Sequence, residues 1–70
     1  MFKAFVQDEY GKVVETYENC MRVSVLPEMQ IMDEYPHIYK AFDIHCPFIV
    51  LVDSLGEHFY PLYQYSVEIG

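Results

Sequence analysis

The stretch Pro47-Phe48-Ile49-Val50-Leu51-Val52-Asp53 decides the fold that we expect for this chain. Residues 48–52 form an unbroken apolar run, and most of them are β-branched. Such a run is typical of a strand that is covered on both faces or lies in the centre of its sheet. A membrane span needs roughly 20 apolar residues, so the run predicts a core strand of a soluble protein.

The C-terminal third should continue this strand as a hairpin. Residues 53–57 have the composition of a tight turn, and residues 58–69 resume a strand-like alternation. The alternation places Tyr63 on the apolar face and Tyr60 on the opposite face. Pro61 has no N–H to donate, so it predicts a bulge or an edge position within this run.

The N-terminal third should form a second hairpin. Residues 2–7 and 13–18 are strand-like, and the turn between them contains Asp8 as a side-chain cap and Gly11 for a positive φ.

A further strand is expected over residues 21–26. Its alternation directs Met21, Val23 and Val25 to the interior, and Pro27 should end it.

The segment between residues 27 and 46 has two interpretations. Residues 27–32 favour a short helix beginning at Pro27, with a short strand as the alternative. Pro36 should keep Tyr35 extended. Residues 38–44 fit the periods of a helix and of a strand equally well.

We therefore expect one domain over residues 1–70, mostly β with a minor helical part. The expected architecture is a small antiparallel sheet or partly open barrel of about five strands, with one short helix or irregular crossover. A chain of this length buries only roughly 60% of its unfolded surface. Because its apolar content is high, at 53%, we expect a homodimer or a higher oligomer formed through a sheet face or edge.

The charge balance limits the classes of function. Eleven acidic and four basic residues leave a net charge of -7, which argues against a surface that binds nucleic acid directly. The N-terminus lacks the apolar region of a signal peptide, so a cytoplasmic protein is expected. Cys20 and Cys46 should be buried, reduced thiols, with a bridge between them as the alternative.

Enzymatic and metal-dependent functions are not expected. His45-Cys46, together with Cys20, His58 and His37 elsewhere in the chain, could in principle supply a zinc site, but the spacing lacks the closely spaced ligand pairs of structural sites. A Cys46/His58 or Cys20/His45 nucleophile pair has no flanking signature, and the acidic surroundings would raise the pKa of a thiol. We expect no cofactor and no metal.

The tyrosines and acids suggest a surface for a protein partner. Seven tyrosines exceed what so small a core can bury, and tyrosine is favoured at binding surfaces. Tyr10 lies in a predicted turn and Tyr60 opposes an apolar face, so both are predicted contact residues. The predicted acidic contacts complete the set: Glu9, Asp33, Glu34 and Glu57.

These features predict a small acidic protein-binding module, an inhibitor or adaptor that engages a basic, nucleic-acid-handling protein. In size and charge the chain resembles the small inhibitors made by bacteriophages and mobile elements, such as anti-restriction and anti-CRISPR proteins. The alternative is a structural or assembly protein whose function is self-association.

Overall fold

A computed structural model describes all residues, 1–70, as six strands and two short helices. The elements follow in chain order: β1 (Phe2–Gln7), β2 (Val13–Cys20), β3 (Arg22–Leu26), α1 (Glu28–Glu34), α2 (Pro36–Phe42), β4 (Phe48–Asp53), β5 (Gly56–Pro61) and β6 (Ser66–Ile69). The mostly β class with a minor helical part is confirmed. The structure has six strands where about five were expected, and two short helices where one helix or irregular crossover was expected.

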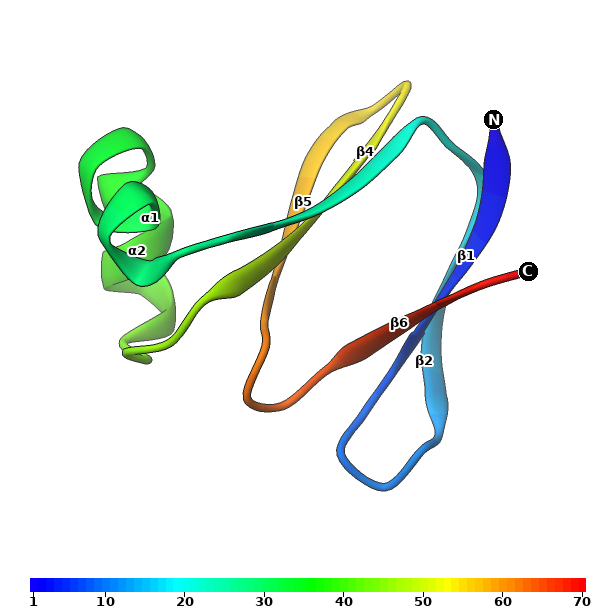
Figure 1. Cartoon of the computed structure of the whole chain (residues 1–70), viewed down its shortest axis with the longest axis horizontal. Coiled ribbons are helices and arrows are strands. Elements are labelled where there is room, and N and C mark those ends of the chain that lie inside the picture. The colour runs from blue at the N-terminus through cyan, green and yellow to red at the C-terminus, as the bar shows by residue number, and fades with distance from the viewer.

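The strands form two antiparallel sheets of three strands each, which do not close into a barrel. The first sheet has the order β2-β1-β6 and the second β3-β4-β5. Figure 1 shows three layers: the helices cover one face of the second sheet, and the first sheet lies on the other side. Both predicted hairpins, β1-β2 and β4-β5, are present.

Strand β4 lies in the centre of the second sheet and is covered on both faces, as its sequence predicts. Phe48 and Val50 face the helices, where they pack with the fully buried Ile31 of α1. Leu51 faces the first sheet and packs with Ala4 and Val6 of β1. The two cores therefore meet at one strand, and each depends on it.

The chain passes from the first sheet to the second in a single residue. Cys20 ends β2 and Arg22 begins β3, while the Met21 N–H donates to the Val52 carbonyl at 2.7 Å. The buried Cys20 thiol donates to the Arg22 and Val52 carbonyls at 3.4 and 3.6 Å. The Cys20 side chain thus packs where the chain crosses between the two sheets. Both cysteines are free and buried, as predicted.

The expected inward face of β3 is only partly correct. Val23 packs on the core between the sheets, but Met21 and Val25 are 50% and 54% exposed. Met21 lies between β2 and β3, where the chain crosses between the sheets. Val25 lies in β3, which is an edge strand that pairs with β4 alone, so the sheet stops beside it.

A proline marks the start of each helix. Pro27 caps α1, and Pro36 occupies the first turn of α2, where its missing N–H costs nothing. Tyr35 lies between the helices with φ −133° and ψ 58°. Its backbone is outside the helical region, as predicted, but it is not fully extended, which differs from the prediction. Asp43 ends α2 in the left-handed conformation, with φ 51°, and its N–H donates to the Tyr39 carbonyl.

The central position of β4 gives a first prediction. Leu51→Ala should lower the free energy of unfolding by about 2–5 kcal/mol, because the fully buried side chain leaves a cavity between the sheets. The matched change Leu55→Ala, in the β4-β5 turn where Leu55 is 87% exposed, should change it by less than about 0.5 kcal/mol. Urea unfolding followed by circular dichroism measures both. Equal losses in the two variants would contradict the double-sided packing of β4.

Candidate functional site

Two turns lie side by side at one end of the first sheet. Gln7, the last residue of β1, pairs with Ser66, the first residue of β6. The β1-β2 turn and the segment that leads into β6 therefore leave the sheet at the same end, as Figure 1 shows. Between them lies a shallow hollow of about 310 Å³.

The β1-β2 turn is held by Asp8. Its Oδ1 atom accepts the N–H groups of Tyr10 and Lys12, both at 2.9 Å, and Gly11 adopts φ 82°. This capping directs Tyr10 into solvent, where it is 87% exposed. The adjacent Glu9 is also exposed and lines the hollow.

The second turn begins where β5 ends, at Pro61. The N–H groups of Gln64 and Tyr65 both donate to the Pro61 carbonyl at 3.1 Å. Tyr65 turns inward against Tyr60, with ring centroids 5.3 Å apart, whereas Tyr63 points outward and is 82% exposed. We call the group formed by Glu9, Tyr10, Leu62 and Tyr63 the turn surface.

The structure corrects the predicted position of Tyr60 on the face opposite the apolar one. Tyr60 is half-buried on the core between the sheets, and its hydroxyl shares a hydrogen bond with that of Tyr17. The strand-like run from residue 58 to 69 is not one strand, because residues 62–65 form a turn between β5 and β6. Tyr60 precedes this turn and is covered because both faces of β5 are packed, with Phe59 on the helix side and Tyr60 on the side of the first sheet. Tyr63 lies in the turn itself and is exposed. Pro61, which was predicted to mark a bulge or an edge position in this run, is the last residue of β5, an edge strand.

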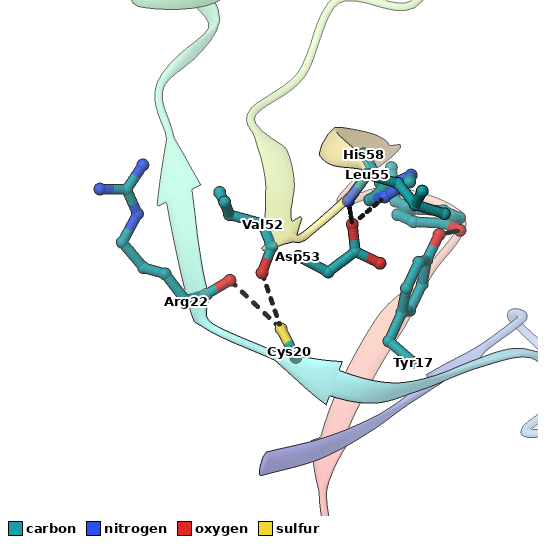
Figure 2. A network of polar contacts seen from close by, with 8 residues as sticks. Tyr17, Cys20, Arg22, Val52, Asp53, Leu55 and His58 are labelled. Atoms are coloured by element: carbon teal, nitrogen blue, oxygen red, sulfur yellow. Dashed lines mark hydrogen bonds and ion pairs between the residues drawn. The ribbon is translucent and has the colours of Figure 1, made fainter. Parts of the chain in front are cut away.

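A polar groove runs between β2 and the β4-β5 hairpin. The Asp53 Oδ1 atom lies 2.9 Å from the His58 Nε2 atom and also accepts the Leu55 N–H at 2.9 Å. The His58 ring packs on Tyr17 with centroids 4.8 Å apart, as Figure 2 shows in close view. This network was not predicted, because it joins β2 to a hairpin more than thirty residues further along the chain.

Burial and hydrogen bonding change the acidity of this network. Burial, together with the hydrogen bond to Tyr60, raises the pKa of Tyr17, and burial also raises the pKa of Tyr60. The hydrogen bond from His58, aided by the Leu55 N–H, lowers the pKa of Asp53 below its ordinary value of 3.8. Both hydroxyls therefore stay protonated and Asp53 stays ionised at neutral pH.

A third hollow, which we call the helix groove, lies where α1 meets the second sheet. It has a volume of about 370 Å³ and is lined by Leu26 and Val50, with Glu34 and Glu57 among its polar residues. The Tyr35 hydroxyl donates to the Glu57 Oε2 atom at 2.9 Å, which raises the pKa of Tyr35. Arg22 also lines the groove and forms no ion pair.

The six predicted contact residues therefore lie in four places. Glu9 and Tyr10 share the turn surface, Glu34 and Glu57 share the helix groove, and Tyr60 belongs to the network between the sheets. Asp33 is exposed near the end of α1. Asp33 and Glu34 both lie in the last turn of α1.

Two of the histidines considered for a zinc site or a nucleophile pair have other polar partners. His58 contacts Asp53, and His45 contacts Tyr39 and Glu28 through its Nδ1 atom at 2.6 and 3.1 Å. Hydrogen bonds from Tyr39 and then from His45 lower the pKa of Glu28. No three His, Cys, Asp or Glu side chains converge in an arrangement suited to a metal ion. None of the helices is long and apolar enough to cross a membrane.

Comparisons with family models, with curated proteins and with solved structures found no match. The functional argument therefore rests on the surfaces described above.

The Asp53–His58 pair gives a prediction for acid titration. His58→Ala should raise the pKa of Asp53 part of the way toward 3.8, since the Leu55 N–H still donates to it. A carboxyl with a lowered pKa contributes stability that is complete above about pH 3.8 and is lost as the pH falls through the folded-state value. The wild type should therefore exceed His58→Ala in free energy of unfolding at neutral pH, and this difference should become smaller as the pH falls. Carboxyl ¹³C NMR titration and urea unfolding at several pH values measure the two effects.

His37→Ala is the matched control, since His37 is an exposed residue of α2. It should leave the Asp53 titration unchanged. An Asp53 titration that is identical in wild type and His58→Ala would contradict the assignment.

Proposed function

We propose that this chain is a non-enzymatic protein-binding module, an inhibitor or adaptor that engages a nucleic-acid-handling protein through that protein's basic surface. The observation that carries the proposal is the turn surface, which places the two most exposed tyrosines of the chain on neighbouring turns beside Glu9. Tyrosine contributes large contact area and a hydrogen bond at a low cost in side-chain entropy, and it is enriched among residues that dominate binding energy.

The electrostatics of the whole chain support a basic partner. The chain has eleven acidic side chains and only four lysines and arginines. Among the lysines and arginines, Lys3 alone forms an ion pair, with Glu18. The exposed carboxylates therefore remain largely uncompensated. A negative field of this kind accelerates association with a positive surface and competes with nucleic acid for it.

The two parts of the turn surface have different roles in this proposal. Tyr10 and Tyr63 act as anchors that bury area against the partner, so they govern dissociation. Glu9 lies at the rim, where a charge mainly affects the rate of association and its dependence on salt.

The experiment is affinity capture of the tagged chain's partner at about 50 mM and about 500 mM salt, followed by direct binding with the purified partner. We expect a basic protein whose affinity falls with salt. The double variant Tyr10→Ala/Tyr63→Ala should weaken binding by at least about tenfold, mainly through faster dissociation. Glu9→Gln should slow association and leave dissociation nearly unchanged.

Leu55→Ala is the matched control, because Leu55 is as exposed as Tyr10 but lies in the β4-β5 turn, away from the turn surface in Figure 1. It should bind as the wild type does. Capture of no protein, a partner whose affinity is insensitive to salt, or equal losses in Leu55→Ala and the tyrosine variant would each count against the proposal.

A further inference from the structure

Strand β3 has a free edge. It pairs with β4 on one side only, and its backbone makes no hydrogen bond to another element on the far side. In an antiparallel pair every second residue directs both its N–H and its C=O away from the neighbouring strand. Such an edge is a template for a further strand unless charge, proline or a covering segment protects it.

The free edge of β3 lacks the negative charge that the other edge strands carry. Each of the other three edge strands contains at least one carboxylate: β2 has Glu15 and Glu18, β5 has Glu57 and β6 has Glu68. The only charged residue of β3 is Arg22. Between two copies that each carry a charge of -7, repulsion is therefore weakest where β3 meets β3.

The apolar surface of the second sheet is exposed at the β3 edge. Val25 is 54% exposed, whereas its cross-strand neighbour Ile49 is only 4% exposed. The apolar layer on this face of the second sheet thus continues to the edge and stops there. A strand added beside β3 would cover Val25.

The sequence of β3 suits pairing with itself. An antiparallel two-fold arrangement centred on Ser24 sets Val23 opposite Val25 of the second copy, and the symmetry forms this apolar pair twice. The same register sets Arg22 opposite Leu26. Leu26 lines the helix groove together with Glu34 and Glu57, so Arg22 of the second copy approaches a groove with an excess of negative charge.

We propose that β3 pairs with β3 of a second copy, which joins two second sheets into a six-stranded antiparallel sheet. The Val23–Val25 contacts and the backbone hydrogen bonds stabilise the pair, and Arg22 of each copy offsets carboxylates of the other. Since β3 contributes no residue to the turn surface, the dimer presents two turn surfaces to a partner.

Sedimentation analysis from about 10 μM to about 1 mM tests this pairing against a monomer of 8.3 kDa. The wild-type mass should rise toward twice the monomer value with concentration. Val25→Lys should remain a monomer, because two lysines then oppose apolar side chains at the seam. The matched control Val14→Lys makes the same charge change at a 45% exposed valine of β2, and it should dimerise as the wild type does.

Hydrogen exchange of the wild type gives a second measurement that does not depend on a folded variant. Amides of β3 should exchange more slowly as the concentration rises, whereas amides at the free edge of β2 should not change. Salt separates this proposal from the binding of a basic partner: screening strengthens an association of two negative copies and weakens that of opposite charges. A monomer at every concentration, equal dimerisation of the two lysine variants, or unchanged β3 exchange would overturn the pairing without affecting the proposed function.

Discussion

The burial of β4 on both faces is the constraint on which the other elements depend. Phe48 and Val50 need the helices, while Leu51 needs the first sheet. A chain of 70 residues can satisfy both requirements only with thin layers, so two helices of seven residues cover one face and one three-stranded sheet covers the other. The same thinness leaves the outer faces and the β3 edge open to solvent.

Tyrosine side chains hold the thin layers to one another. The hydroxyl of Tyr17 meets that of Tyr60 between the sheets, and that of Tyr35 reaches Glu57 from the helical layer. Tyr39 donates to Glu28 at 2.7 Å, which connects the two helices. A tyrosine ring contributes apolar burial while its hydroxyl finds a polar partner at the border of a small core. These four tyrosines therefore have a structural role. Tyr10 and Tyr63 are exposed instead and remain available for contact with a partner.

The contact residues were harder to predict than the strands. The turn that contains Tyr10 was predicted correctly because its environment is local: Asp8 and Gly11 form it within four residues. Tyr60 was assigned to the wrong environment, since its burial depends on Tyr17 of another sheet. Glu34 and Glu57 were both predicted as contact residues, but the sequence did not indicate that they lie close together. The packing of α1 on the second sheet brings them to one groove.

The sequence by itself determined the β-rich class, both hairpins, the central strand and the acidic character. These follow from alternation, turn residues and composition, which act over a few neighbouring positions. The tertiary structure alone decided that residues 38–42 are helical, that residues 62–65 turn, and that β3 ends a sheet. In each case the local periods or propensities allow more than one conformation. The contacts that select one, such as Ile38 on the core beside β4, come from residues distant in the chain.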